Sequence, residues 1–353
     1  MTKEEGNPIP FSTLGRIEQG QLDPGMRRLQ RLLRLYHLPI QAAGDLLDLD
    51  DLLDELPSER DPTKLYKEGL AAWQKGDLRK AIAHFVALRQ SADEGKLEMR
   101  QRATLAFAVA AGSLGKHHLS LLLLDDLLVQ PIDKALLVPV LVQAARAWHG
   151  LNGFEAAHAF LARARVHLAK GAHLQRAWIE HEAASIAIDE RDFAGSDRAI
   201  AIALRAYRAA GDQFNYGRAL GTQLRSQFER EKPVGVLRMA KVARFHAKRH
   251  GLKRNELQRT IDEGRAYLLQ RDPKRAVALL THALADAIRL GDPAGRFSAH
   301  YYLWEAHRMA GNEREASRAF DAAAQDLAYV DQVSKETIRM REILRDRGSR
   351  MRR

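Results

Sequence analysis

The chain contains no cysteine among its 353 residues. This absence excludes disulfide scaffolds, thiolate zinc sites, iron–sulfur clusters and cysteine nucleophiles. Aromatic residues make up only 7% of the chain, and runs of β-branched residues are rare, so little in the sequence favours β-strands. Nearly every long segment instead spaces its apolar residues three and four positions apart. This periodicity predicts an all-α protein.

Long hydrophobic runs are also missing. The longest uncharged run, Ala103 to Gly115, has thirteen residues, which is too short to cross a bilayer. The opening residues, MTKEEGNPIP, do not follow the basic and then apolar pattern of a signal peptide. We therefore expect a soluble, cytoplasmic protein that makes no membrane contact. Its length suits about two domains or one repeat array.

The motifs that carry most enzyme chemistry do not occur. There is no phosphate-binding loop, no Gly-x-Gly-x-x-Gly, no Gly-x-Ser-x-Gly and no His-Glu-x-x-His. Paired carboxylates such as Asp125–Asp126 do not face each other on a helix, and the adjacent histidines His117–His118 cannot share one helical face. The sequence therefore predicts no catalytic residue, no metal site and no cofactor, and we expect the protein not to be an enzyme.

Charge is unevenly distributed along the chain. Lys and Arg number 56 against 45 Asp and Glu, which gives a net charge of +11. Residues 41–60 carry seven acidic residues and one basic residue, and we expect them to form an acidic linker or short helix. Residues 225–259 and the tail 335–353 are strongly basic. Such clusters favour contact with polyanions but do not by themselves establish nucleic-acid binding.

From Asp61 onward, short Gly-Asp or Asn-Gly turns recur at a regular interval. Each turn precedes a helix with a small or apolar residue near its start. These marker positions are Ala81, Ser120, Ala157, Ser196, Leu237, Ala276 and Ala316. Their spacing is 37 to 41 residues, which is enough for two helices. A period of this kind predicts a stacked helical solenoid of about seven hairpins.

The repeating units resemble tetratricopeptide repeats. The first unit matches the pattern of that family at Gly69, Gly76, Asp77, Ala81, Phe85 and Leu88, the sixth at Gly264, Tyr267, Asp272, Ala276, Leu280 and Ala283, and the seventh at Gly311, Asn312, Ala316, Phe320 and Ala323. The middle units keep only the spacing. The resemblance implies a right-handed α-solenoid over residues 61–334, in which a ligand binds along the concave face.

The N-terminal segment resembles the second half of a Cro/repressor-type helix-turn-helix domain. The matching residues are Ser12, Thr13, Leu14, Arg16, Ile17, Glu18 and Gly20 for a recognition helix, Pro24, Leu29, Leu32, Leu33 and Tyr36 for the next helix, and Leu46 and Leu47 for a third. In that family a full helix and a supporting helix come first, whereas this chain has only MTKEEGNPIP there. We therefore expect residues 1–40 to form a partial DNA-binding domain, either cut short by the assigned start codon or a relic.

This second resemblance implies specific DNA contacts. Phe11, Ser12, Thr13 and Arg16 lie at the start of the expected recognition helix, where that family meets the major groove. Arginine is the commonest reader of guanine, and hydroxyls can bond phosphates or base edges. The alternative for Ser12 is an ordinary helix N-cap.

Basic side chains on the repeat helices are candidates for ligand contact. Arg238, Lys241, Arg244 and Lys248 follow one helical face, where they could bind a carboxylate, an acidic partner or a DNA backbone. The alternative is a solvated outer face. In tetratricopeptide arrays the first helix of each hairpin lines the concave surface, and the predicted register places there Arg176, Asn215, Arg218, Arg225 and His300.

The order of these segments resembles bacterial transcription regulators that sense a short peptide in a repeat domain. The resemblance implies a homodimer that binds DNA and whose array responds to a peptide or other small ligand. The alternative hypothesis is a tetratricopeptide scaffold or adaptor that binds protein partners and carries a relic DNA-binding head.

Overall fold

The structure, a computed structural model, describes residues 44–45, 56–91, 97–230, 233–330 and 334–350. The chain divides into two units, Met1–Leu56 and Pro57–Arg353. The four residues predicted to contact DNA (Phe11, Ser12, Thr13 and Arg16) fall outside the described residues, as does most of the acidic segment 41–60.

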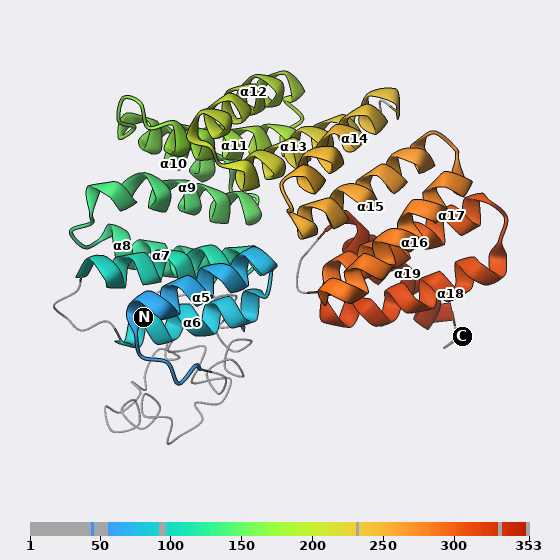
Figure 1. The fold of residues 1–353 in the computed structure, drawn as a ribbon, viewed down its shortest axis with the longest axis horizontal. Coiled ribbons are helices and arrows are strands. Elements are labelled where there is room, and N and C mark those ends of the chain that lie inside the picture. Colours follow the sequence, from blue (N-terminus) through green and yellow to red (C-terminus); the bar gives the residue numbers. More distant parts are fainter. Residues whose placement is uncertain (1–43, 46–55, 92–96, 231–232, 331–333, 351–353) are drawn as a thin grey trace, which may run out of the picture. The chain divides into compact units, whose positions relative to one another are not determined.

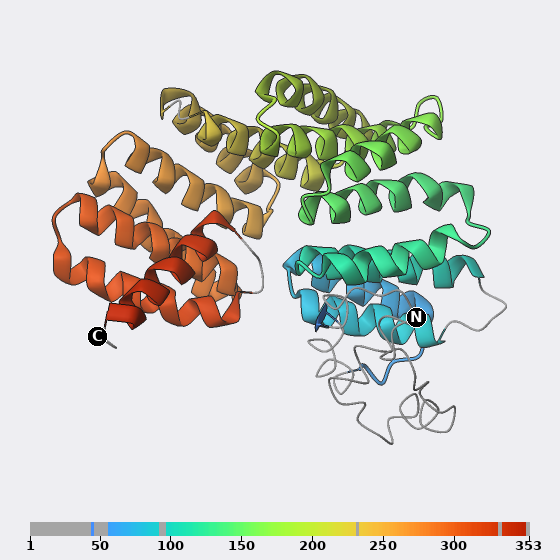
Figure 2. The same cartoon turned by 180° about the vertical axis from the view of Figure 1, so that it is seen from behind.

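The unit Pro57–Arg353 is an array of antiparallel helical hairpins. Seven hairpins follow one another along the described residues: α5 (Pro62–Lys75) and α6 (Leu78–Ser91), α7 (Leu97–Ser113) and α8 (His117–Leu128), α9 (Lys134–Gly150) and α10 (Phe154–Val166), α11 (His173–Asp189) and α12 (Phe193–Ala210), α13 (Gln213–Glu229) and α14 (Pro233–Arg249), α15 (Lys253–Leu269) and α16 (Pro273–Leu290), and α17 (Pro293–Met309) and α18 (Glu313–Asp326). A short 3₁₀ helix (Leu327–Tyr329) and α19 (Lys335–Arg350) complete it. The colours in Figures 1 and 2 follow this order from blue to red. The prediction of an all-α solenoid with about seven hairpins is confirmed.

The recurring Gly-Asp pair stops one helix and starts the next. Gly211, with φ of 71°, ends α12 in the left-handed conformation that glycine adopts without strain. The side chain of Asp212 then accepts a hydrogen bond from the backbone N–H of Asn215 at 2.9 Å and caps α13. Gly291 and Asp292 repeat the same arrangement between α16 and α17. These turns fold each pair of helices back on one another.

Small residues let the helices of each hairpin approach closely. A Cβ atom on Gly69 would lie 2.6 Å from Cε1 of Phe85, and one on Gly264 would lie 2.7 Å from Cγ of Leu280. Six of the seven marker positions are almost fully buried: Ala81, Ser120, Ala157, Ser196, Ala276 and Ala316. The small side chains at these positions are therefore required by close packing, as the repeat pattern predicts.

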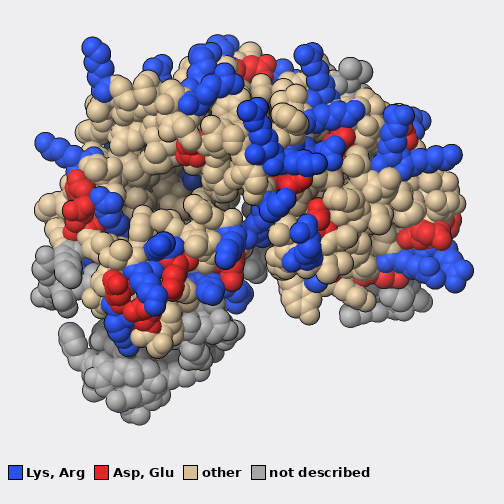
Figure 3. All heavy atoms as spheres, in the orientation of Figure 1, with Lys and Arg blue, Asp and Glu red and all other residues tan. Residues whose placement is uncertain are grey.

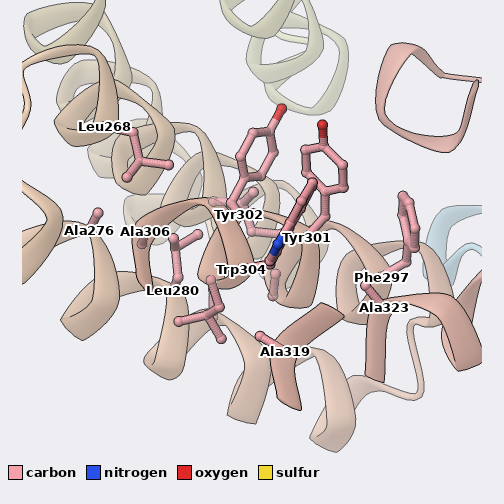
Figure 4. Close-up of a cluster of buried hydrophobic side chains, with 14 of the residues drawn as sticks. Leu268, Ala276, Leu280, Phe297, Tyr301, Tyr302, Trp304, Ala306, Ala319 and Ala323 are labelled. Atoms are coloured by element: carbon pink, nitrogen blue, oxygen red, sulfur yellow. The ribbon is translucent and has the colours of Figure 1, made fainter. Parts of the chain in front are cut away.

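A large buried cluster joins the last hairpins. The aromatic side chains of α17 pack among small and aliphatic side chains of α15, α16 and α18 (Figure 4). The rings of Trp304 and Phe320 meet edge to face, with centroids 5.4 Å apart. This arrangement fills the space between consecutive hairpins, so each hairpin is stabilised by its neighbours.

The basic C-terminal segment is part of the array. The charge pattern predicts a tail over residues 335–353, but Lys335–Arg350 form α19. Met340 on this helix is fully buried in the cluster of the last hairpins. The hydroxyl of Tyr302 donates a hydrogen bond to Glu336, and Arg339 pairs with Glu305 at 3.1 Å. The segment folds because its apolar residues share one helical face. A count of its charges gives no information on this spacing.

The described helices include none that is both long and apolar enough to span a membrane. Within the described ranges, no group of three or more His, Asp or Glu side chains is arranged to hold a metal ion.

Candidate functional site

The first helix of each hairpin is called its inner helix, and the second its outer helix. Two adjoining pockets are lined mainly by inner helices. The first, called the apolar pocket, has a volume of about 290 Å³. Side chains from α5, α6, α7, α9 and α11 supply its apolar walls. Its larger apolar residues include Tyr66, Leu70, Trp73, Phe85, Leu105, Val142 and Trp178. A pocket of this composition suits apolar side chains of a ligand.

The second pocket is strongly cationic. It has a volume of about 520 Å³ and is lined by α9, α11, α13 and α15. Two carboxylates, Glu182 and Asp262, face it. They are outnumbered by its five arginines, which are Arg146, Arg218, Arg225, Arg259 and Arg265. This cationic pocket therefore carries an excess of positive charge, which favours an anionic ligand.

An ion network around the buried carboxylate of Glu182 forms one wall of the cationic pocket. His149 lies between two carboxylates, with Nδ1 2.8 Å from Glu182 and Nε2 2.8 Å from Asp189. Burial opposes a charge on this ring, but the hydrogen bonds to Asp189 and Glu182 outweigh burial and raise the pKa of His149 to about 9. Arg146 donates to Glu182 at 2.9 Å. His149 is therefore protonated at neutral pH, and both carboxylates are already paired.

The neighbouring histidine is neutral. His181 is buried, with Nε2 2.8 Å from the hydroxyl of Thr222 and Nδ1 3.2 Å from that of Tyr207. Burial, together with the nearby charges of Arg218 and Arg146, lowers the pKa of His181 to about 3. Its ring thus acts as a hydrogen-bonding spacer between hairpins and adds no charge to the pocket.

Arg218 lies where the two pockets meet. Together with Arg146 it lines both of them. Its guanidinium donates to the side-chain oxygen of Asn215 at 3.3 Å. Among the described residues, no carboxylate lies within ion-pairing distance of Arg218. Burial and the nearby charge of Arg146 lower the pKa of Arg218, so its positive charge is poorly compensated in the free protein.

The far wall of the cationic pocket depends on two glycines of α13. The Arg259 guanidinium lies against Gly221, where a Cβ atom would be 2.0 Å from its Nη1. Gly217 similarly faces Asn255, whose amide nitrogen would lie 3.1 Å from a Cβ atom at that position. The side-chain nitrogen of Asn255 is buried and has no hydrogen-bond partner within the described structure, whereas Nε of Arg259 lies 3.1 Å from Asp262. The wall therefore contains a donor, on Asn255, that a bound acceptor could satisfy.

The predicted ligand contacts are only partly brought together. Asn215, Arg218 and Arg225 line the pockets. Arg176 is exposed on α11 and lines neither pocket. His300 lies apart from both and pairs with Asp326 at 2.7 Å.

The basic stripe lies on the outer helix of its hairpin. Arg238, Lys241 and Lys248 are exposed on α14, and Lys and Arg side chains gather along the edge formed by α12 and α14 (Figure 3). Arg244 instead pairs with the buried carboxylate of Glu263 at 2.7 Å. Three residues of the predicted stripe thus match a solvated outer face, whereas Arg244 has a structural partner.

Several residues of the pockets were not anticipated from the sequence. They are Trp73, Arg146, His149, Trp178, Glu182, Arg259 and Arg265. Each lies on the first helix of a hairpin, so aligning the repeats by their turns could have grouped them. The charge of the arginines alone gave no such signal, because exposed arginines are common throughout the chain.

Comparison with solved structures supports the architecture. The chain is similar to a Rap protein complexed with Competence and Sporulation Factor, with a TM-score of 0.58, 11% identity, and coverage of 82% of this chain and 87% of that chain. It is also similar to the apo form of RapI, with a TM-score of 0.53, 11% identity and 77% coverage of each chain. A signal transduction ATPase with a tetratricopeptide repeat sensor, from Pyrococcus horikoshii, gives a TM-score of 0.59 and 14% identity over 92% of this chain and 53% of that chain. No protein-family model and no curated protein sequence matches the chain. These likenesses show a tetratricopeptide-like fold.

Proposed function

We propose that the repeat array is a binding module, an adaptor or sensor, whose two joined pockets hold a segment of a peptide or protein ligand. The observation that carries this proposal is the position of Arg146 and Arg218 at the junction of an apolar pocket and a cationic pocket. A peptide offers both apolar side chains and polar groups at short spacing, so it can occupy both pockets at once.

The fold comparisons support the same kind of function. One similar structure is a Rap protein in complex with a factor, and another contains a tetratricopeptide repeat sensor. The first protein is complexed with another molecule, and in the second a tetratricopeptide repeat is the sensor. The proposal extends that role to this chain on the strength of its own pockets.

Selection from a displayed library of random heptapeptides tests this function. Ala106 lines the apolar pocket, so Ala106→Trp should fill it without altering any charge. Ala285, exposed on α16, gives the matched control Ala285→Trp. We expect peptides selected on the wild type to bind Ala285→Trp equally and Ala106→Trp at least about tenfold more weakly. Equal binding to all three proteins would overturn the proposal, once both variants are shown to melt as the wild type does.

A second candidate function is DNA-binding transcription regulation by a homodimer. Its support is the resemblance of residues 8–50 to a helix-turn-helix domain. DNA selected from a random library by the full chain tests it. Arg16→Ala should weaken binding to the selected site by about 1–3 kcal/mol while leaving random DNA nearly unaffected. Failure to select any sequence, with a monomeric mass by light scattering, would leave the adaptor as the proposed function.

A further inference from the structure

We infer that the ligand of the joined pockets carries a carboxylate beside an apolar group, and that Arg218 binds this carboxylate. The inference rests on the proposed function, because it specifies the chemistry of a ligand held in the same pockets. It is carried by the geometry around Arg218, which differs from that of the other arginines of the site.

The carboxylates near Arg218 are already engaged with other groups. Glu182 is held by Arg146 and His149. The side chain of Asp212 accepts hydrogen bonds from the backbone N–H and the side-chain amide of Asn215, at 2.9 and 2.7 Å. Neither the Glu182 carboxylate nor the Asp212 carboxylate can turn toward Arg218 without losing these interactions. The charge of Arg218 therefore calls for an anion from outside the described residues.

The other arginines of the cationic pocket have partners of their own. Arg259 lies 3.1 Å from Asp262, and Arg225 donates to the backbone oxygen of Ser185 at 2.9 Å. Arg265 stacks on the ring of Phe228, with its guanidinium carbon 4.1 Å from the ring centroid. Among the described arginines of the cationic pocket, Arg218 is thus the one with neither a carboxylate nor an aromatic ring as partner. A carboxylate carries one negative charge and matches this single guanidinium, which favours it over a doubly charged phosphate.

The position of Arg218 also fixes where the rest of the ligand lies. Its guanidinium borders the apolar pocket, so a carboxylate bound there places its attached group among side chains such as Trp178, Leu105 and Val142. Burial of an apolar side chain in that pocket adds to the ion pair. Two parts of a peptide meet this requirement: a C-terminal apolar residue, or an Asp or Glu next to an apolar residue.

Small probes test the charge requirement directly. N-acetyl-L-tryptophan has a carboxylate beside an apolar ring, and N-acetyl-L-tryptophanamide is its neutral counterpart. We expect the acid to bind the wild type with a dissociation constant on the order of a millimolar, and the amide about tenfold more weakly, by NMR titration. Equal binding of acid and amide to the wild type would overturn the inference without any variant.

Substitution of Arg218 provides the second part of the binding experiment. Arg218→Met should weaken binding of the acid about tenfold and leave the amide unchanged. Arg205, exposed on α12, supplies the control Arg205→Met, which should bind both probes as the wild type does. In the absence of ligand, Arg218→Met should melt at the same temperature as the wild type or higher, because it removes a half-buried charge that has no carboxylate partner. Unchanged binding of the acid to Arg218→Met would overturn the inference.

Further comparisons distinguish a side-chain carboxylate from a C-terminal one, and distinguish failure of this inference from failure of the proposed function. N-acetyl-L-aspartyl-L-tryptophanamide has only a side-chain carboxylate, so its affinity relative to N-acetyl-L-tryptophan tells whether a side chain or a C-terminus is preferred. Phenyl phosphate binding more tightly than either would contradict the match to a single charge. Selected peptides that bind in the pockets but lack carboxylates would contradict this inference without contradicting the proposed function.

Discussion

The ring of Trp73 on α5 meets the ring of Phe214 on α13, with centroids 5.7 Å apart and planes at 60°. The two residues belong to the first and fifth hairpins, so the contact joins distant repeats directly. Trp73 also lines the apolar pocket. The contact therefore borders the apolar pocket and links α5 directly to α13.

Loss of this ring contact should loosen the array without unfolding it. An aromatic pair contributes about 0.5–1.5 kcal/mol beyond the burial of its surface. We expect Phe214→Ala to increase the radius of gyration measured by small-angle scattering in the absence of ligand. Phe245, whose side chain is largely exposed on α14, gives the control Phe245→Ala. Identical scattering from all three proteins would show that contacts between neighbouring hairpins alone determine the radius of gyration of the array.

Stability should depend on pH through His149. Its pKa in the folded protein is about 9, above its ordinary value of 6.5. The folded state therefore holds the proton more tightly, so this stabilisation is complete below pH 6.5 and is lost as the pH rises through 9. We expect His149→Gln to lower the melting temperature at pH 6.5, and the difference from the wild type to shrink toward pH 9.5.

The matched control for this pH series is His282→Gln, because His282 is exposed on α16. Its melting temperature should follow that of the wild type across the whole range. A constant difference between His149→Gln and the wild type at every pH would contradict the protonated state assigned to His149.

The Arg244–Glu263 pair should matter for folding more than for ligand binding. The side chain of Glu263 is only 3% exposed, and Arg244 lies 2.7 Å from its carboxylate. Arg244→Met would leave the buried carboxylate without this partner, so we expect it to lower the free energy of unfolding by about 2 kcal/mol or more. Urea titration should show this loss, while Lys248→Met, on the exposed face of the same helix, stays within about 0.5 kcal/mol of the wild type. Equal midpoints for the two variants would make the ion pair energetically unimportant.

Substitution by alanine should change the stability of the protein in opposite directions at two glycines of the array. At Gly264 a Cβ atom would lie 2.7 Å from Leu280, so Gly264→Ala should destabilise the protein by about 1–3 kcal/mol. At Gly235, exposed on α14, the nearest heavy atom would be 3.5 Å away. Gly235→Ala should therefore stabilise the helix by about 0.5–1 kcal/mol. Thermal unfolding that shifts both variants in the same direction would contradict this assignment.

Much of the array could be predicted because its signals are local. The Gly-Asp turns end and cap neighbouring helices through bonds between residues close in sequence, such as Asp212 and Asn215. The small marker residues repeat because every hairpin needs the same close approach. The helix α19 was not predicted, since the many charges of residues 335–353 indicated only a basic C-terminal tail.

The pockets could be predicted only in part. Asn215, Arg218 and Arg225 share one inner helix and were grouped by its periodicity. The pairing of Arg244 with Glu263 was not foreseen, because the two residues lie on successive helices and their contact depends on helix rotation. Arg176 and His300 show the same limit: they lie on inner helices but outside the pockets.

Apolar periodicity and turn chemistry act over a few residues and recur, so an all-α array of about seven hairpins could be predicted from the amino acids alone. Which charges are compensated depends instead on how the hairpins pack. His149 is held between carboxylates of the next inner helix, whereas Arg218 reaches a junction of two pockets where no carboxylate of the described residues pairs with it. Such compensation depends on distances of a few ångströms between helices that lie about one repeat apart in the chain, and these distances are fixed only when the hairpins pack.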